Sequence, residues 1–436
     1  MKTIQYPVSY LVEETTAARW AKISFCIYLF FMVFGTMMPF QASLQERAAQ
    51  GEIGSSNILN QLLSLLFVVS FLSLWGKQQQ IFDFVRKEKF LTLFLLWALL
   101  SVFWSNYSVV SLKRWITLFG EVVICLAAML HVRWSEVALR YFRLILSIYL
   151  PLTILSVIFI PEAIQWEFPA WRGLAITKNN LGQVALFSII IWFAIIPYNR
   201  KKVVNIFHYL MLAFAIAAYL GARSTTSFLV GAFLLMIAGI LYMARTSNMG
   251  VIARFYAITL VSSLICIAVI IMIWAPEIIA SFLGLFGKDL TFTGRVELWQ
   301  AVLRMTQEKL WMGWGLGGFW VMSGEHLIPM FQQFVWIPNQ AHQGYIDILN
   351  QTGLVGLLLL LAMGVSYVAN LSSLKKKNVW KWLFIGVLIL NIQESVFFRP
   401  RHLGHFVFVF AYVAFYCDLI KEKQAQVSQQ IIAITR

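Results

Sequence analysis

Charged side chains are scarce in this sequence, since Asp, Glu, Lys and Arg make up only 12% of its 436 residues. Hydrophobic residues account for 60%, which leaves too little polar surface for a water-soluble protein of this length. The apolar residues are grouped into runs of about 20, long enough to cross a bilayer as helices. The composition therefore excludes a soluble protein and predicts an all-α, polytopic membrane protein.

Acidic residues are the scarcer charged type, with 19 Asp and Glu against 34 Lys and Arg, a formal net charge of +15. A basic balance of this size often indicates nucleic-acid binding. Here, however, the cations are mostly dispersed in short loops between apolar runs, as in membrane proteins whose loops contact anionic lipid heads. We therefore expect the lipid bilayer as a partner and no nucleic acid.

Signatures of metal, disulfide and cofactor chemistry are also missing. The four cysteines lie in or beside apolar runs and form no Cys-x-x-Cys pair, so neither a metal site nor a disulfide framework is indicated. There is no His-Glu-x-x-His, no Gly-Lys-Ser phosphate loop and no Gly-x-Ser-x-Gly elbow. Residues 313–318 match the spacing of a dinucleotide-binding motif, but no strand precedes them, so we interpret their glycines as a tight turn. We expect no metal and no cofactor.

The apolar runs predict about twelve membrane spans. They fall near residues 22–40, 57–75, 90–105, 115–131, 142–160, 181–197, 204–221, 225–243, 255–275, 353–370, 380–396 and 403–420. No small-x-small cleavage site follows the first run, so we expect a transmembrane helix there and not a cleaved signal. This predicts nine helices in residues 1–275, one large loop with amphipathic helices in residues 276–352, and three helices with a short cytoplasmic tail in residues 353–436.

The basic residues of the short loops predict the orientation. If the N-terminus is cytoplasmic, one set of loops lies inside, and it carries Lys77, Arg86, Lys87, Lys89, Arg133, Arg140, Arg143, Arg200, Lys201, Lys202, Arg245, Arg254, Lys375, Lys376, Lys377 and Lys381. Cytoplasmic loops of membrane proteins are enriched in Lys and Arg. The loop of residues 276–352 is then on the outer side, with both chain ends inside.

A second set of cations remains on the outer side, where the orientation rule does not require them. It comprises Lys113, Arg114, Arg172, Lys178, Arg223, Arg295, Arg399, Arg401, His402 and His405. A single cation at the membrane edge can simply extend toward water. Several on one face indicate a cationic pocket at the outer mouth, suited to a phosphate-bearing lipid head.

Arg295 is a candidate for that pocket because it stands at the start of a helix-like stretch, residues 296–311. Thr293 can cap this stretch, and the free N–H groups of a helix N-terminus together with a guanidinium form an anion site. The alternative is an ordinary loop arginine paired with Asp289 or Glu297.

His342 precedes a predicted span and is followed by Tyr345 and Asp347. A histidine at a membrane mouth can exchange a proton near neutral pH. The alternative is a helix-end histidine that bonds only to backbone.

Arg223 lies in the short turn between two apolar runs, so its charge needs a partner. Glu394, Asp347 or a substrate phosphate could serve. Glu394 is itself a rare acid inside an apolar run, and it could pair with one of these arginines or with Arg399. Two further cations, Arg172 and Lys178, precede another run.

Four motifs in this order resemble the O-antigen ligase superfamily. They are Thr-Gly-Arg-x-x-x-Trp at 293–299, Gly-Trp-Gly-x-Gly-x-Phe-Trp at 313–320, Ala-His-Gln-Gly-Tyr-x-Asp at 341–347, and Gly-Leu-x-Gly at 353–356. The superfamily includes lipopolysaccharide O-antigen ligases and O-antigen and exopolysaccharide polymerases. Its usual pattern is Ala-His-Asn-x-Tyr, and this chain has Gln343 in place of the Asn. The segments 104–106 and 178–182 look most like the exopolysaccharide-polymerase branch.

The resemblance implies a metal-independent glycosyltransferase of the C type at the periplasmic face of a bacterial inner membrane. Its donor would be a glycan on undecaprenyl diphosphate, and its acceptor another glycan or lipid A–core. His342 would act on the acceptor hydroxyl, and Arg223 and Arg295 would neutralise the departing diphosphate. The substrate-binding residues would be Arg172, Lys178, Arg114 and Tyr345.

Several alternatives remain open. The Lys-Asn-Asn-Leu-Gly segment favours a polymerase slightly over an O-antigen ligase, and a protein O-oligosaccharyltransferase is a further member of the same superfamily. A polysaccharide transporter or flippase is a different class for which about twelve spans is common. The single large outer loop, the lack of a detectable repeat and the scarcity of mid-span charges argue against it. A scaffold subunit of an envelope complex is the third class.

Overall fold

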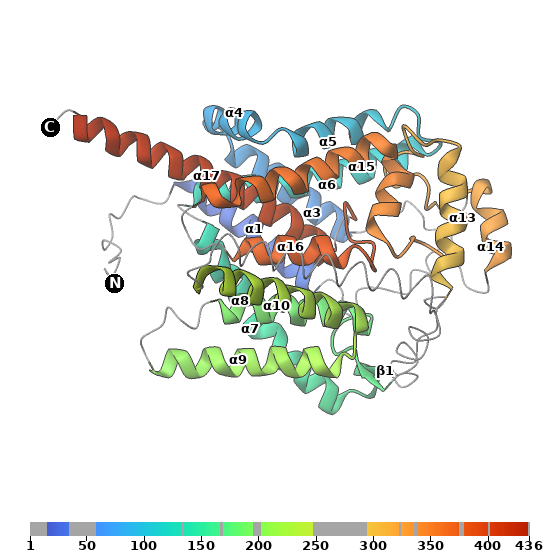
Figure 1. Cartoon of the computed structure of the whole chain (residues 1–436), viewed down its shortest axis with the longest axis horizontal. Helices are drawn as coiled ribbons and strands as arrows, with labels where there is room; N and C mark the ends of the chain where they lie inside the picture. The colour runs from blue at the N-terminus through green and yellow to red at the C-terminus, as the bar shows by residue number, and fades with distance from the viewer. Residues whose placement is uncertain are drawn as a thin grey trace.

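The computed structural model describes residues 15–34, 58–132, 135–165, 169–194, 202–246, 294–321, 324–334, 338–374, 379–399 and 402–434. Helices dominate these residues (Figure 1). The only strands within them are β1 (Ile164–Gln165) and β2 (Ala170–Trp171), which pair antiparallel. The all-α prediction is therefore confirmed.

The helices are the following. The α-helices are α1 (Thr16–Phe34), α3 (Ile58–Ser73), α4 (Gln78–Lys87), α5 (Phe90–Leu100), α6 (Ser108–His131), α7 (Ser135–Phe159), α8 (Lys178–Phe193), α9 (Lys202–Gly221), α10 (Thr225–Thr246), α13 (Arg295–Gln307), α14 (Ile328–Gln333), α15 (Gly344–Asn370), α16 (Trp380–Leu390) and α17 (Leu403–Ile434). Short 3₁₀ helices are η2 (Pro161–Ala163), η4 (Glu325–Leu327) and η5 (Leu371–Ser373).

Four of the described helices are long and apolar enough to cross a membrane: Thr16–Phe34, Ser135–Phe159, Gly344–Ser373 and Leu403–Gln430. A fifth is obtained if α3 and α4, bent by 103°, are counted as one broken span. Shorter apolar helices are Phe90–Leu100, Asn205–Gly221, Thr225–Ile240 and Trp380–Leu390. The apolar run 255–275 lies outside the described residues. The count of about twelve spans therefore stays a prediction.

Helix α17 forms the centre of the bundle. Its side chains from Phe406 to Cys417 are almost completely buried, and they pack against α16, α6, α4, α1 and α7. By contrast, Trp75, Phe103 and Leu235 are among many large apolar side chains exposed on the outside. An exposed apolar belt around a packed interior is the arrangement that a lipid environment favours.

In two of the predicted spans the helix is shorter than the apolar run. The run 90–105 is helical only to Leu100, and the run 380–396 only to Leu390. In the second case the chain turns into a buried loop, residues 391–399. The side-chain carbonyl of Asn391 accepts the backbone N–H groups of Val396 and Phe397, each at 2.9 Å. This side chain satisfies backbone groups that a continued helix would have paired, so the loop is stable inside apolar surroundings.

Helix α15 is broken near its start at Gly353, whose φ is +69° and ψ −173°. A Cβ at this position would overlap the carbonyl group of Trp311. Glycine permits both the backbone conformation and the close approach of the segment that follows α13. The first turns of α15 are thereby held against the loop that precedes them.

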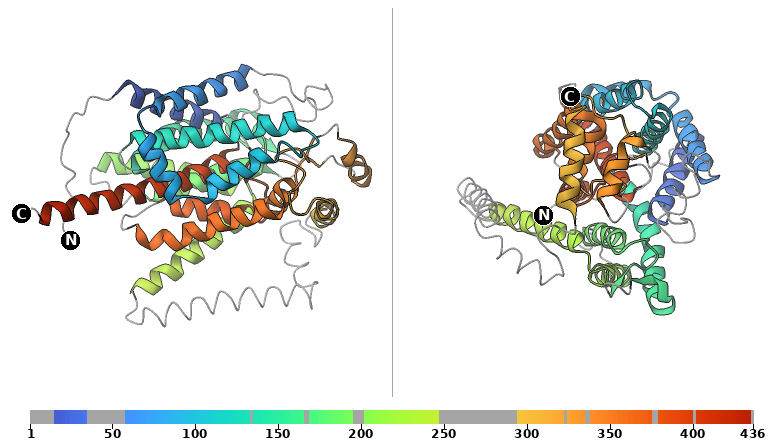
Figure 2. Two further views of the ribbon diagram at one scale, coloured as in Figure 1. Left: turned by 90° about the horizontal axis from the view of Figure 1, so that it is seen from above. Right: turned by 90° about the vertical axis from the view of Figure 1, so that its right-hand side faces the viewer.

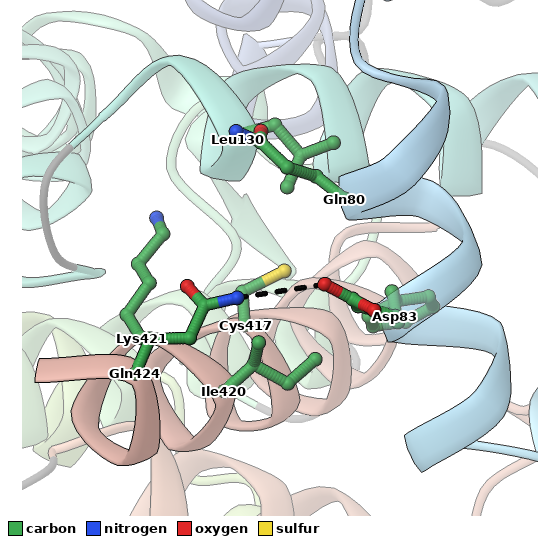
Figure 3. Close-up of a pocket in the computed structure, with 8 residues that line it drawn as sticks. Gln80, Asp83, Leu130, Cys417, Ile420, Lys421 and Gln424 are labelled. Carbon is green, nitrogen blue, oxygen red and sulfur yellow. Dashed lines mark hydrogen bonds between the residues drawn. The ribbon is translucent and has the colours of Figure 1, made fainter. Parts of the chain in front are cut away.

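The two ends of the bundle differ (Figures 1 and 2). α13, α14 and the β1–β2 hairpin lie at one end, and α4 and the C-terminus of α17 at the other. A small pocket between α4, the end of α6 and α17 lies at the α4 end (Figure 3). There Gln424 Nε2 donates to Asp83 Oδ2 at 3.5 Å. None of the predicted site residues lines this pocket.

Candidate functional site

Glu394 is the centre of a polar cluster at the α13 end of the bundle. Its Oε1 accepts a hydrogen bond from Asn179 Nδ2 at 2.8 Å and lies 3.8 Å from Arg295 Nη2. Its Oε2 lies 3.6 Å from His342 Nδ1. The side chain of Glu394 is only 10% exposed, so these contacts are only weakly screened by solvent. One buried carboxylate therefore joins three segments that are far apart in the sequence.

Arg295 is the first residue of α13. Gly294, with φ +78°, is the N-cap and supplies no side-chain cap, and Thr293 lies outside the described residues. Besides facing Glu394, the guanidinium donates from Nη1 to the carbonyl of Gln393 at 2.6 Å. The pairing with Glu297 considered from the sequence is not found, and Asp289 lies outside the described residues. Arg295 thus combines a fixed charge with a helix N-terminus.

The backbone at His342 is strained and firmly held. Its φ is +53°, which is unfavourable for a residue with a Cβ. The N–H of the preceding Ala341 donates to both oxygens of Asp347 at 3.2 Å, and Trp299 Nε1 donates to the Ala341 carbonyl at 2.8 Å. Trp320 Nε1 donates to Asp347 at 2.7 Å. Asp347 therefore fixes the turn that presents the imidazole.

Gln343 caps α15. Its Oε1 accepts the N–H of Ile346 at 2.6 Å, and its own N–H donates to Ser395 Oγ at 2.9 Å. A side-chain oxygen at the N-cap is what the start of a helix requires. The Gln in place of the usual Asn therefore preserves a cap, and it ties α15 to the neighbour of Glu394.

Gln340 links His342 to Arg399. Arg399 Nη1 donates to Gln340 Oε1, so the amide nitrogen of Gln340 faces the imidazole and lies 3.1 Å from Nδ1. Burial lowers the pKa of Arg399, and the carboxylates of Asp347 and Glu394 oppose this shift. Nδ1 of His342 accordingly has a donor and an acceptor beside it. In the neutral tautomer protonated at Nε2, Nδ1 can accept from Gln340. When the proton is on Nδ1, it lies on the side of Glu394 and Nε2 can accept a proton.

Arg223 is joined to this cluster through its neighbour. Ser224 Oγ donates to Asn179 Oδ1 at 3.1 Å, and Asn179 in turn donates to Glu394. The guanidinium of Arg223 itself is exposed. Within the described ranges it forms no ion pair with Glu394 or Asp347, so neither carboxylate is the direct partner considered from the sequence.

Arg172 and Lys178 lie close to the same turn. Lys178 directly precedes Asn179 at the start of α8. Arg172 Nε donates to the carbonyl of Glu162. The neighbouring Trp171 packs so closely on Gly221 that a Cβ there would overlap its ring, which brings the β1–β2 hairpin beside the end of α9. Both cations therefore flank the Arg223 turn.

The contacts described for Arg114 and Tyr345 are with other parts of the chain. Arg114, on α6, lies along the glycine-rich turn: a Cβ on Gly317 would be 2.7 Å from its Cγ. Tyr345 donates to the carbonyl of Leu388 at 2.9 Å. Gly313, Gly315 and Gly317 have φ of +70°, +94° and +71°, which confirms that this segment is a tight turn.

The prediction that His405 lies at the outer mouth is wrong. Its side chain is fully buried inside the bundle, with Nε2 2.9 Å from Glu121 Oε2. Tyr28 OH donates to the other oxygen of Glu121. The reason is that α17 begins at Leu403 and enters the packed interior within its first turn.

Backbone strain is concentrated at the cluster. Among the described residues other than glycine, φ is positive at Arg223, His342 and Phe398 alone. Two of these are predicted catalytic residues, and the third adjoins Arg399. Strained residues that the surrounding structure holds in place are frequent at functional sites.

Sequence reasoning did not select Asn179 and Gln340, and it named Glu394 and Arg399 only as possible ionic partners or outer cations; the pairing of Glu394 with an arginine is found at Arg295. Glu394 carried a signal, because an acid inside an apolar run is rare. Asn179 and Gln340 are neutral amides without such a signal.

Comparisons with known proteins agree with this geometry. A family model described as O-antigen ligase matches residues 210–361, a range that contains Arg223, Arg295 and His342. The chain is also similar to the exopolysaccharide production protein ExoQ of Rhizobium meliloti (strain 1021). The two are 25% identical over 337 residues, which cover 73% of this chain and 74% of that protein. These matches support what the motifs indicate: the chain is similar to O-antigen ligase/polymerase-like membrane proteins.

Proposed function

We propose that this protein is a glycosyltransferase that polymerises glycan repeat units from undecaprenyl diphosphate at the periplasmic face of the bacterial inner membrane. The observation that supports this most is the sharing of Glu394 between His342 and Arg295. It places a proton acceptor beside a cation that can bind an anionic leaving group. The glycosyltransferase class itself rests on the family match and the ExoQ relative.

The reaction assigned to the site is a displacement at the anomeric carbon of the donor glycan. The acceptor hydroxyl oxygen forms the new bond to this carbon, while the bond to the diphosphate oxygen breaks and its electron pair stays with the lipid diphosphate. His342 takes the hydroxyl proton. With its Nδ1–H directed at Glu394, the Nε2 of His342 is the base, and the carboxylate stabilises the imidazolium that forms.

The diphosphate is neutralised by the arginines. Arg295 stands at the N-terminus of α13, where the helix dipole adds to its charge. Arg223, exposed on a strained turn, supplies a second guanidinium that can bind phosphate oxygens bidentately. Arg172 and Lys178 extend this positive surface along the α8 end of the site. Because side chains supply the positive charge, we propose that no metal is required.

The acceptor distinguishes a polymerase from the alternatives. A polymerase transfers to another lipid-linked glycan, an O-antigen ligase to lipid A–core, and a protein O-oligosaccharyltransferase to a protein. The 178–182 segment and the similarity to an exopolysaccharide production protein favour the polymerase.

The test uses purified protein with undecaprenyl-diphosphate repeat units extracted from a strain that lacks the gene, with and without lipid A–core. A ladder of products formed without lipid A–core supports the polymerase. Transfer only to lipid A–core identifies a ligase. No transfer at all by an intact, folded protein would contradict the enzyme.

A second test separates the enzyme from a flippase. In a His342→Ala strain, the enzyme predicts loss of long chains while single repeat units still reach the outer face. Repeat units trapped on the inner face would instead indicate transport.

A further inference from the structure

Asn179 has no chemical role in the proposed reaction, but it lies between two parts of the site. Its side-chain amide makes two hydrogen bonds of opposite polarity: Nδ2 donates to Glu394 Oε1 at 2.8 Å, and Oδ1 accepts from Ser224 Oγ at 3.1 Å. An ionised carboxylate can only accept, so the orientation of the amide follows from Glu394. An amide is the side chain that fits both neighbours at once.

The two bonds join two parts of the bundle. Glu394 belongs to the loop after α16, which also contacts His342 and Arg295. Ser224 belongs to the turn between α9 and α10, directly after Arg223. Within the described contacts around Glu394, Asn179 is the residue through which that turn reaches the carboxylate.

The packing at this point is close enough to keep the link short. A Cβ on Gly182, one turn after Asn179, would lie 2.7 Å from Ser224 Cβ. Ser224 also bonds to Ser227 Oγ at 3.2 Å, which orders the first turn of α10. The serine is therefore held in place from its own helix, and its bond to Asn179 transmits that position to Glu394.

We propose that Asn179 is a positioning residue for glycosyl transfer. It holds the Glu394 carboxylate beside His342 and ties the Arg223 turn to that carboxylate. The proton acceptor, His342, and the leaving-group cation, Arg223, are thereby kept in a fixed arrangement. This inference rests on the proposed function. It predicts that Asn179 affects both kcat and the KM for the donor. Through Glu394 it affects the chemical step, and through Ser224 it affects donor binding.

The test compares variants of the full-length protein with the extracted undecaprenyl-diphosphate repeat units as the probe. Asn179→Ala loses both bonds, and kcat is expected to fall about 10- to 100-fold, the effect of losing a hydrogen bond to a charged group. Ser224→Ala loses the bond to Asn179 Oδ1 and the bonds to Ser227 but leaves the Asn179–Glu394 bond intact, so the KM for the donor rises while kcat changes less.

The pH profile separates positioning from a merely structural role. Asn179→Asp keeps the size of the side chain but places a second carboxylate beside Glu394. Added negative charge favours the protonated form of the Glu394–His342 pair, so the acid limb of the kcat profile moves upward by about one pH unit. A purely structural defect would lower the whole profile without moving it.

Asn180→Ala is the matched control. Asn180 is an amide on the same first turn of α8, and its bonds go to Thr177. We expect kcat, KM and the profile to stay within about twofold of the parent, with thermal unfolding measured for every variant.

The outcomes are distinguishable from failure of the proposed function. If His342→Ala and Glu394→Gln retain full activity, the proposed function's site is wrong. If those two are inactive while Asn179→Ala behaves like Asn180→Ala, or Asn179→Asp leaves the acid limb in place, only the positioning role is overturned.

Discussion

Replacement of Glu394 by glutamine is the most direct test of the site, because it removes one charge while the size of the side chain is kept. In the proposed reaction an imidazolium forms at His342, whose Nδ1 lies 3.6 Å from Glu394 Oε2. At an effective dielectric constant of about 20, two unit charges at this separation attract by about 5 kcal/mol. The exposed quarter of the His342 side chain reduces this value by solvent screening.

We therefore expect Glu394→Gln to lower kcat by about 100- to 1,000-fold, which corresponds to about 3–4 kcal/mol of transition-state stabilisation. The KM for the lipid-linked donor should not rise, because the same substitution releases Arg295 from its carboxylate partner. The assay is single-turnover transfer in nanodiscs with varied donor concentration.

Glu308→Gln serves as the matched control, since Glu308 is exposed at the end of α13 and makes no contact with the cluster in the described part. It should retain the parent kinetics. A Glu394→Gln protein with kcat within threefold of the parent would refute the role of the carboxylate, and a large rise in KM with unchanged kcat would assign it to donor binding instead.

Three further predictions follow from other parts of the structure. Arg295→Lys should reduce kcat/KM by about 10- to 100-fold, because the single ammonium group of lysine cannot replace a planar guanidinium that binds the Gln393 carbonyl and a phosphate together. Steady-state kinetics test this, and an unchanged kcat/KM would contradict it. Gly353→Ala should lower the free energy of unfolding by at least about 1 kcal/mol, since alanine is strained at φ +69° and its Cβ meets Trp311; a thermal unfolding curve like that of the parent would show otherwise. Burial lowers the pKa of His402 to about 3, so its contribution to stability is complete above about pH 6.5 and is lost as the pH falls toward 3. Between pH 7 and pH 5 the parent should lose about 1–2 kcal/mol more than His402→Gln, and equal losses would refute this.

The sequence predicted the class of fold because a lipid bilayer requires hydrophobic runs long enough to cross it, and such runs are visible in the sequence itself. It also drew attention to Arg295 and His342, since a cation or a histidine at a membrane edge is conspicuous, and both side chains lie beside Glu394. The position of Arg223 beside the cluster is consistent with its selection, although its guanidinium does not reach the carboxylate. Arg114 and Tyr345 are instead occupied near the glycine-rich turn and α16.

The path of the chain at Glu394 shows what could not be predicted, although the residue itself was noted as a possible arginine partner. It lies in a run that hydropathy assigns to a span, yet the helix ends at Leu390 and the chain folds back as a loop. That loop exists because the side chain of Asn391 satisfies two backbone N–H groups. Such a bond depends on the tertiary path of residues 391–397, and no periodicity in the sequence signals it.

The contacts of Glu394 also explain why a cation-rich site has an acid at its centre. Asn179 binds the carboxylate at 2.8 Å, whereas Arg295 lies 3.8 Å away, beyond hydrogen-bond distance. A diphosphate offers a guanidinium a bidentate acceptor with more than one negative charge, so Arg295 can turn to the donor without displacing Glu394. In the proposed reaction, the amide keeps the acid in place, the acid stabilises the imidazolium, and the arginines are left to the leaving group. A site built from arginines and a histidine alone would have repelled the imidazolium as it formed.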